Sequence, residues 1–357
     1  MTEVRNDTVR LADHTTLRVG GTAKRWVEAT TEAELVEAVR SADATGEPVL
    51  VLGGGSNVLV ADDGFDGTVV HVATRGIALA GGSCAIDEPG AAMCGGAVIE
   101  VAAGETWDDF VAHAIARQWR GIEALSGIPG SVGATPIQNV GAYGQEVAES
   151  LWSVRTWDRR TNGFRTFAVG DCGFGYRTSR FKTEPGRYVV LSVTFQFQQG
   201  ALSMPIRYGE LSRRLQLDGR GRAPMSEVRE AVLALRAGKG MVLDAADHDT
   251  WSAGSFFTNP ILDAEQAAAL PDAAPRFLQP DGRVKSSAAW LIEAAGFPKG
   301  FGTAPAMLST KHTLALTNRG GASADDLLAL ARQVRDGVCD RFGITLVPEP
   351  VLVGVTV

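Results

Sequence analysis

Three residues stand in sequence settings that could support chemistry. Ser255 lies between a glycine and two phenylalanines in WSAGSFFTNP (251–260), Arg177 lies in FGYRTSRFK (174–182), and Glu349 lies between two prolines. A serine held in a dry pocket could deliver a proton, and a guanidinium fork could hold a carboxylate. Simpler interpretations remain open from the residues alone: a serine that caps a turn, an arginine on a surface loop and a glutamate on an edge strand.

Two glycine-rich stretches could bind an anion. VLVLGGGSNVLV (49–60) lacks the lysine of a P-loop, and the strand pattern after its glycines disfavours the dinucleotide fold in which a helix follows. Such a loop can still cradle a phosphate with backbone N–H groups, although a tight β-turn is an equal alternative. SGIPGSVGATPIQNVGAYGQEV (126–147) is a second irregular, weakly charged stretch. The two together suggest one long polyphosphate ligand.

Composition and charge exclude several classes of partner. The chain has 357 residues, a formal charge of -7 and 45% apolar residues, which is a globular balance with enough apolar material for two domains. Without a polybasic run, nucleic acid and anionic membranes are not expected as partners. The N-terminal residues lack the apolar segment of a signal peptide, and no long apolar run could span a bilayer, so we expect a cytoplasmic protein.

Metal binding is not expected. No two cysteines form a C-x-x-C pair, and none lies near a histidine at zinc spacing. We interpret all four as reduced thiols and the five histidines as ordinary surface or core residues. The cysteines are Cys84, Cys94, Cys172 and Cys339.

Helix and strand patterns alternate along the first part of the chain, and helices predominate after about residue 224. Apolar spacing and capping residues predict helices over 31–46, 106–121, 225–240, 286–296 and 323–343. Three strand-like runs occupy 48–72, a hairpin with an Asn-Gly turn occupies 151–167, and a strong strand occupies 188–198. The two prolines around Glu349 predict an edge strand or a bulge at the C-terminus.

Five motifs in order resemble one family. LGGGSNVLV, SGIPGSVGATPIQNVGAYGQEV, FGYRTSRFK, GSFFTNP and PEP resemble the UDP-N-acetylenolpyruvoylglucosamine reductases, from about Thr15 to Val353. The resemblance implies an α+β fold with an FAD-binding domain of the vanillyl-alcohol-oxidase (PCMH) type and an α+β substrate domain. It implies domains over 15–199, split near 75 into two subdomains, and 200–346, with a returning C-terminal strand over 347–357.

The resemblance also implies an activity and a catalytic set. Family members hold FAD non-covalently, take a hydride from NADPH, and reduce the enolpyruvyl ether of UDP-N-acetylglucosamine enolpyruvate to UDP-N-acetylmuramate for the bacterial cell wall. By this likeness Arg177 would stabilise the enolate and Ser255 would donate the proton. Glu349 would be protonated, or would orient a water or Ser255. We expect a monomer.

The binding residues are carried over by the same resemblance. Those expected along FAD are Gly53, Gly54, Gly55, Ser56, Asn57, Ser126, Gly127, Gly130, Ser131, Gly133, Ala134, Gln138, Asn139, Gly141, Ala142 and Tyr143. Those expected at the UDP-sugar are Tyr176, Tyr208, Arg236, Lys239, Asn259 and His312. Tyr208 implies the subtype that closes a tyrosine-bearing loop over the substrate. The sequence after Lys239 departs from the family's lysine-proline pattern, and His312 stands where other members can have glutamine.

Two rival functions remain. A flavin oxidase of the same fold acting on a carbohydrate often needs a histidine or cysteine tether, and the glycine-rich loops offer none. A non-redox protein that binds a nucleotide sugar would not need Arg177, Ser255 and Glu349 together.

Overall fold

The structure is a computed structural model that describes residues 3–6, 9–81, 96–219 and 221–357. The chain divides into two compact units that interleave along the sequence. The first unit comprises Met1–Asp7, Lys24–Gly54 and Asp66–Ala237, and the second comprises Thr8–Ala23, Gly55–Phe65 and Gly238–Val357. The domain boundaries expected from the sequence at 199/200 and 346/347 stay a prediction.

A four-stranded sheet and one helix open the first unit. The strand order is β1 (Glu3–Asn6), β2 (Ala23–Ala29), β5 (Phe65–Val72), β3 (Val49–Leu52), and helix α1 (Glu32–Thr45) lies between β2 and β3 in sequence. Thr31 and Glu34 form a capping box at the start of α1, and Gly46, with φ 70°, ends the helix. The helix expected over 31–46 is therefore confirmed.

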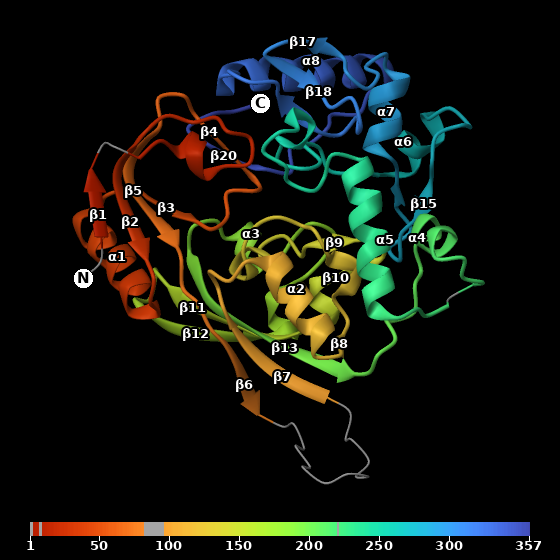
Figure 1. Cartoon of the computed structure of the whole chain (residues 1–357). Helices are drawn as coiled ribbons and strands as arrows, with labels where there is room; N and C mark the ends of the chain where they lie inside the picture. The colour runs from red at the N-terminus through yellow and green to blue at the C-terminus, as the bar shows by residue number, and fades with distance from the viewer. Residues whose placement is uncertain (1–2, 7–8, 82–95, 220) are drawn as a thin grey trace, which may run out of the picture. The chain divides into compact units, whose positions relative to one another are not determined.

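A six-stranded sheet forms the largest part of the first unit (Figure 1). Its order is β12 (Gly163–Ala168), β11 (Leu151–Asp158), β13 (Tyr188–Gln199), β7 (Gly96–Ala102), β6 (Ile77–Gly81), with β8 (Trp119–Arg120) paired to β13. All residues of β13 from Val189 to Val193 are buried, whereas after Val193 the exposed Gln196 and Gln198 alternate with buried phenylalanines, because successive side chains of a strand point to opposite faces. The hairpin expected over 151–167 and the strand expected over 188–198 are confirmed, but the turn occupies residues 159–162, because Gly163 already pairs with Asp158.

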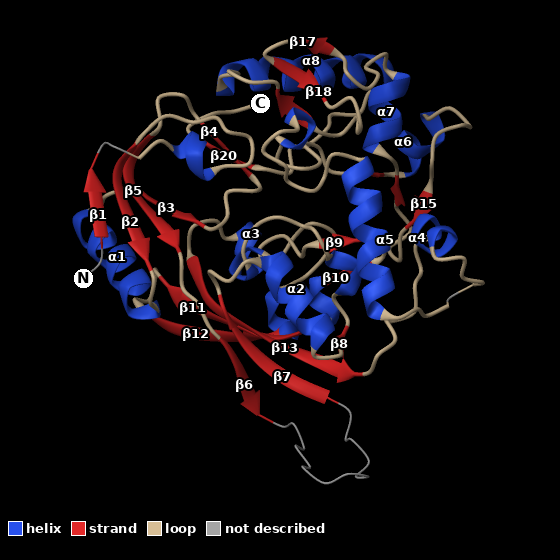
Figure 2. Ribbon diagram, viewed as in Figure 1, coloured by secondary structure: helices blue, strands red, loops and turns tan. Residues whose placement is uncertain are grey.

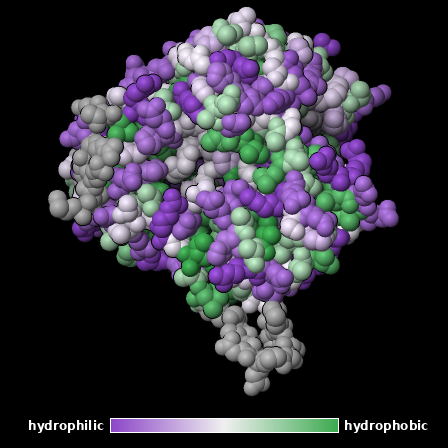
Figure 3. Space-filling model, viewed as in Figure 1, coloured by the Kyte–Doolittle hydropathy of each residue, from purple (hydrophilic) through white to green (hydrophobic). Residues whose placement is uncertain are grey.

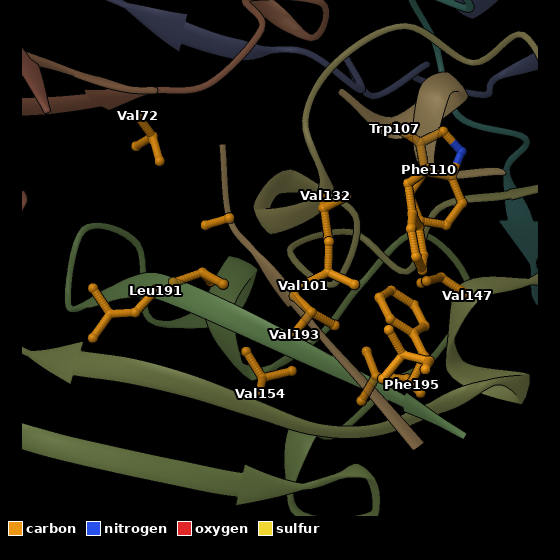
Figure 4. Packing of buried hydrophobic residues seen from close by; sticks show 14 of the residues in the cluster. Val72, Val101, Trp107, Phe110, Val132, Val147, Val154, Leu191, Val193 and Phe195 are labelled. Atoms are coloured by element: carbon orange, nitrogen blue, oxygen red, sulfur yellow. The ribbon is translucent and has the colours of Figure 1, made fainter. Parts of the chain in front are cut away.

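Helix α2 (Trp107–Ala116) packs its aromatic side chains against β13. The Phe110 ring lies 5.1 Å from the Phe195 ring and 6.1 Å from the Phe197 ring, and the Trp107 ring lies 6.1 Å from Phe195. Figure 4 shows Trp107, Phe110 and Phe195 in one core with Val132 and Val147. Buried aromatic pairs at such distances add to the hydrophobic stabilisation and hold the loop that follows α2.

A second, smaller core lies under helix α5 (Met225–Gly238). It joins Val228 and Val232 of this helix with Leu211 of α4 (Gly209–Arg214) and Ala124. The remaining short elements of the first unit are β9 (Gly141–Ala142), β10 (Gln145–Glu146), α3 (Arg180–Thr183) and the 3-10 helices η2 (Glu123–Leu125), η3 (Val132–Ala134), η4 (Val147–Glu149) and η5 (Val169–Cys172).

The second unit combines three small sheets with three helices (Figure 2). Strand β4 (Val58–Val60) pairs in parallel with β20 (Val351–Val353). Helix α8 (Ala324–Phe342) begins at a capping box on Ser323 and ends at Gly343, as the sequence predicts. The others are β14 (Ile261–Leu262), β15 (Phe277–Leu278), β16 (Val284–Lys285), β17 (Gly302–Thr303), β18 (Ala306–Leu308), β19 (Leu316–Asn318), α6 (Ala264–Ala269), α7 (Ala288–Ala294), η1 (Leu11–His14) and η6 (His248–Thr250).

Two expected helix boundaries are wrong. Helix α2 ends at Ala116 instead of continuing to residue 121, because Gln118 has φ 58° and the next two residues pair with β13. Its expected cap, Thr106, makes no side-chain cap hydrogen bond. Helix α5 begins at Met225, before the expected cap Ser226, and the Met225 N–H donates to the Ala201 carbonyl.

Among the described residues, no helix is long and apolar enough to cross a membrane. The face drawn in Figure 3 carries hydrophilic residues with hydrophobic ones interspersed. Cys172 and Cys339 are free thiols, whereas Cys84 and Cys94 lie outside the described residues. No group of potential metal ligands occurs in the described part of the chain.

Candidate functional site

The two glycine-rich stretches meet in the first unit. A Cβ atom added to Gly54 would lie only 2.8 Å from the Cα atom of Gly130, and one added to Gly53 would collide with the Ser131 hydroxyl. Gly130 itself has φ 112°, a conformation that L side chains rarely adopt. Close backbone approach therefore requires glycine on both loops. Such a side-chain-free cradle suits a ligand bound through backbone N–H groups.

Some backbone donors of this cradle are used inside the protein. The Val132 and Gly133 N–H groups donate to the carbonyls of Glu105 and Ala103, both at 2.8 Å, and the Ala134 N–H donates to Ser131. A Cβ atom on Gly133 would lie 2.5 Å from the Ala103 Cβ. Gly133 and Ala134 therefore shape the loop.

Asp108 holds the first residues of the second glycine-rich stretch (126–147) in place. Its carboxylate accepts the Gly127 N–H at 2.5 Å and two hydrogen bonds from the Arg229 guanidinium, at 2.6 and 2.8 Å. Burial alone would raise the pKa of Asp108, but these hydrogen bonds outweigh burial and lower it. The sequence gives little warning of this residue, because its partners lie 19 and 121 residues away.

Glu123 is a second buried carboxylate that sequence reasoning missed. It is 1% exposed and accepts hydrogen bonds from the N–H groups of Gly121 and Met204, at 2.7 and 2.6 Å, and from the Gln145 amide at 3.0 Å. It thereby ties the start and the end of the 126–147 stretch together. A single charged residue within the apolar run IEAL is the only local signal.

Arg177 lies against the glycine-rich stretch. Its Nη2 donates to the Gly141 carbonyl at 2.6 Å and its Nη1 donates to the Asn139 carbonyl at 3.4 Å. A Cβ atom on Gly141 would lie 3.1 Å from Arg177 Nη1, so this position favours glycine. The Arg177 backbone has φ 52°, a left-handed conformation that costs free energy in a non-glycine residue and is common at functional sites.

The turn that carries Arg177 is tied to the same stretch. Gly175 and Thr178 exchange backbone hydrogen bonds across it, and the Ser179 hydroxyl donates to the Ile137 carbonyl at 2.5 Å. Ser179 also caps helix α3. The centroid of the neighbouring Tyr176 ring lies 5.6 Å from the Arg177 guanidinium, and its place in the site wall stays a prediction.

Three residues expected at the substrate or the cofactor cluster beside α5. The Tyr143 and Tyr208 rings meet edge to face at 5.4 Å, and a Cβ atom on Gly127 would lie 3.4 Å from Arg236 Nε. Burial lowers the pKa of Arg236, against the opposing effects of Tyr143 and Asp108. Tyr208 is 43% exposed, so its ring is accessible to a ligand.

Ser255 and Glu349 lie on adjacent backbone segments of the second unit. The Glu349 N–H donates to the Phe256 carbonyl at 2.8 Å, and Phe257 bridges to Pro348. Asn57 lies beside them, since its amide donates to the Glu349 carbonyl at 3.4 Å. The edge-strand prediction for this region agrees with the single parallel pairing of β20 to β4.

The residues around Ser255 bear on whether this serine caps a turn or donates a proton. Phe256 and Phe257 are each 1% exposed and belong to the hydrophobic core, so packing explains them. The turn hydrogen bond is made by Ser252, whose hydroxyl accepts from the Gly254 N–H at 3.2 Å. Ser252 therefore fills the capping role proposed for Ser255.

Other predicted site residues of the second unit have internal roles. The side-chain oxygen of Asn259, Oδ1, accepts the Ala288 N–H at 2.9 Å and so caps helix α7. The His312 N–H donates to the Ser309 hydroxyl, and the adjoining Thr310 donates to the buried Asp249. Asp249 also pairs with Arg319 at 2.7 Å, so it anchors the loop that carries His312. Gly55, Ser56 and Lys239 belong to this unit as well.

Comparisons with known proteins match two parts of the chain to two described families. A family described as "UDP-N-acetylenolpyruvoylglucosamine reductase, C-terminal domain" matches residues 246–353, and an FAD binding domain matches residues 23–161. The UDP-N-acetylenolpyruvoylglucosamine reductase of Cutibacterium acnes is 61% identical over 98% of this chain and 90% of its own length. That of Streptomyces coelicolor is 54% identical over 97% of this chain and 89% of its own length.

A solved structure of a UDP-N-acetylenolpyruvylglucosamine reductase is also similar to this chain. The crystal structure of the UDP-N-acetylenolpyruvylglucosamine reductase from Thermus caldophilus covers 99% of this chain and 100% of its own, with a TM-score of 0.67 at 26% identity. The α+β architecture expected from the sequence, an FAD-binding domain followed by a family-specific C-terminal domain, is confirmed. The chain belongs to the UDP-N-acetylenolpyruvoylglucosamine reductase family, whose members are flavin-dependent oxidoreductases of peptidoglycan precursor synthesis.

Proposed function

We propose that this chain reduces UDP-N-acetylglucosamine enolpyruvate to UDP-N-acetylmuramate, with NADPH as the reductant. Non-covalently bound FAD would supply the hydride, which adds to the terminal vinyl carbon. The carbon–carbon double bond is lost, and negative charge develops on the carbon beside the carboxylate. Ser255 gives its proton to that carbon, so the two new C–H bonds account for one hydride and one proton, and Ser255 regains its proton from solvent.

Arg177 stabilises the charge that develops in this step. The observation that carries the proposal is the hydrogen bond from Arg177 Nη2 to the Gly141 carbonyl, at 2.6 Å, because it holds a guanidinium on the loop expected to bind FAD. A guanidinium fork can bind the substrate carboxylate and the enolate oxygen together. Its pre-set orientation means that little reorganisation is needed during the reaction.

Ser255 and Glu349 act as a pair. A free hydroxyl is a poor acid, so Ser255 needs a neighbour that supports proton transfer. The hydrogen bond between Glu349 N–H and the Phe256 carbonyl keeps the Glu349 backbone next to the serine. Glu349, either protonated or orienting a water or Ser255, then avoids repelling the enolate.

The remaining predicted residues would bind the two ligands. Gly53, Gly54, Gly130 and Ser131 form the close-packed cradle for FAD. Arg236 and Lys239 suit the diphosphate of the UDP-sugar. Tyr208 would close over the substrate, in support of which its ring is 43% exposed beside Tyr143. We infer a monomeric enzyme that works in the cytoplasm, and its elution volume in gel filtration tests the monomer.

The test is an anaerobic visible spectrum of the purified protein. A flavin band should bleach with NADPH and return when UDP-N-acetylglucosamine enolpyruvate is added. Bleaching that only oxygen reverses would favour the carbohydrate oxidase instead. A colourless protein that still binds a UDP-sugar would favour a non-redox binding protein.

A further inference from the structure

The side chain of Asn139 connects three segments of the first unit. It is 1% exposed, and its Nδ2 donates to Glu146 Oε2 at 2.7 Å and to the Gly175 carbonyl at 3.2 Å. Its Oδ1 accepts the Ala148 N–H at 3.2 Å. An amide has two N–H donors, and both are accounted for by these partners. The side chain of Asn139 is therefore engaged with the protein, although its place in the glycine-rich stretch suggested a contact with FAD.

The Gly175 carbonyl belongs to the turn that carries Arg177. Gly175 and Thr178 are bridged by two backbone hydrogen bonds, at 3.1 and 3.3 Å, so Arg177 lies within this four-residue turn. The Asn139 amide therefore holds the backbone that presents Arg177. This contact joins residues 36 apart in the sequence.

The backbone of Asn139 holds the other end of the same arginine. Its carbonyl accepts from Arg177 Nη1 at 3.4 Å, beside the Gly141 carbonyl that accepts from Nη2. Both residues adopt left-handed backbone conformations, with φ 49° for Asn139 and 52° for Arg177. Asparagine tolerates this conformation better than most residues, whereas arginine needs support from its surroundings. One residue thus fixes both the turn and the guanidinium.

We propose that Asn139 is a positioning residue for Arg177 and makes no side-chain contact with FAD. The inference rests on the proposed function, because it assumes that Arg177 acts in the transfer to the substrate. A displaced guanidinium would slow reoxidation of the flavin by the enol ether. It would not change how the flavin is bound or how NADPH reduces it.

Two variants test the proposal by anaerobic stopped-flow spectroscopy of the two half-reactions. Asn139→Asp keeps the size and the Oδ1 acceptor but removes both Nδ2 donors and sets a carboxylate against Glu146. Asn139→Gly removes the side chain, and glycine adopts the positive φ without strain. This variant provides the test if Asn139→Asp folds poorly. Both should retain FAD with an unchanged visible spectrum and a near-normal rate of reduction by NADPH. Reoxidation by UDP-N-acetylglucosamine enolpyruvate should slow by about 10- to 100-fold.

Asn318→Asp is the matched control. Asn318 is also a buried asparagine, 2% exposed, whose Nδ2 donates to the Leu17 and Arg18 carbonyls and whose Oδ1 accepts from the Gly320 and Ala322 N–H groups. All of these partners lie in the second unit. An equal slowing of reoxidation in Asn318→Asp would attribute the effect to general loosening and overturn the proposal.

The remaining outcomes separate this inference from the proposed function. Loss of FAD or an equal slowing of both half-reactions in the Asn139 variants would make Asn139 a cofactor contact and overturn the positioning role. Arg177→Lys is measured in parallel. If Arg177→Lys reoxidises slowly and the Asn139 variants reoxidise normally, the positioning role alone fails. If Arg177→Lys reoxidises normally, the catalytic role of Arg177 fails, and the inference fails with it.

Discussion

The regions around Arg177 and Ser255 are held by different kinds of interaction. Arg177 depends on side chains, because its guanidinium donates to carbonyls and its turn is held by the Asn139 amide and the Ser179 hydroxyl. Ser255 depends on the main chain, because the neighbouring Phe256 N–H donates to the Leu314 carbonyl and the Phe256 carbonyl accepts the Glu349 N–H. A substitution can therefore remove a support of Arg177 directly, whereas the support of Ser255 survives most side-chain changes.

Two phenylalanines strengthen this difference. Phe256 and Phe257 anchor the Ser255 segment in a core, with their rings 5.1 Å apart. The Arg177 turn instead contains Gly175, its guanidinium lies beside Gly141, and Arg177 has a left-handed backbone. We conclude that the first region is tuned by polar contacts and the second by packing.

Arg177→Lys should have the largest effect on the first region. A single ammonium cannot bond the Gly141 carbonyl and a carboxylate with the geometry of a fork, so reoxidation by the enol ether should slow about 100- to 1,000-fold. Single-turnover spectroscopy measures this rate. Arg180→Lys is the control, because Arg180 lies three residues on and donates to the Asp171 carbonyl at the surface. Near-normal turnover of Arg177→Lys would remove the arginine from the mechanism.

Two glycine substitutions, one in each region, should have smaller effects than Arg177→Lys. Gly141→Ala would bring a Cβ atom to 2.9 Å from the Gln145 carbonyl and 3.1 Å from Arg177 Nη1, so the backbone must shift beside the guanidinium and reoxidation should slow by about tenfold. Gly254→Ala, next to Ser255, has open space around the added atom but φ 72°, so it should cost about 1 kcal/mol of stability with little change in rate. Stopped-flow rates and urea unfolding of both variants test this. A slower rate in Gly254→Ala, with only a loss of stability in Gly141→Ala, would contradict the difference between the two regions.

The last prediction concerns the pH dependence of stability in the first unit and no rate. Hydrogen bonds from Arg187 lower the pKa of Asp158 to about 2, and the carboxylate is 1% exposed. Because the pKa is depressed on folding, the stabilisation is present above about pH 4 and is lost as the pH falls toward 2. Between about pH 5 and pH 2.5, the free energy of unfolding in urea should fall in both proteins. The fall should be about 1–2 kcal/mol smaller in Asp158→Asn than in the unaltered protein. An unchanged pH dependence would argue that this pair does not support the first unit.

Local signals in the sequence predicted much of the fold. Helices α1 and α8 begin and end where Thr31, Gly46, Ser323 and Gly343 indicate, because caps act within a few residues. The end of α2 was missed because the chain there pairs with β13, about 80 residues away. Local patterns carry no information about such long-range pairing.

The candidate site divides in the same way. The meeting of Gly54 with Gly130 agrees with the idea of two loops around one ligand, which followed from their composition. The internal roles of Asn139 and Asn259 could not be predicted, because the Asn139 amide also bonds Gly175, 36 residues away, and the partner of the Asn259 side chain lies 29 residues away. The hydrogen bond from the Gly254 N–H to Ser252 could not be predicted from the sequence, which drew attention to Ser255 alone.

The most direct test of the account is the reoxidation rate of Ser255→Ala under anaerobic conditions, with Ser252→Ala as its matched control. The account predicts that Ser255→Ala is reduced by NADPH at a near-normal rate and is reoxidised by UDP-N-acetylglucosamine enolpyruvate about 100- to 10,000-fold more slowly. Ser252→Ala should lose only a turn hydrogen bond and keep both rates. Equal slowing of both half-reactions in Ser255→Ala, or no slowing of either, would contradict a proton transfer from this serine.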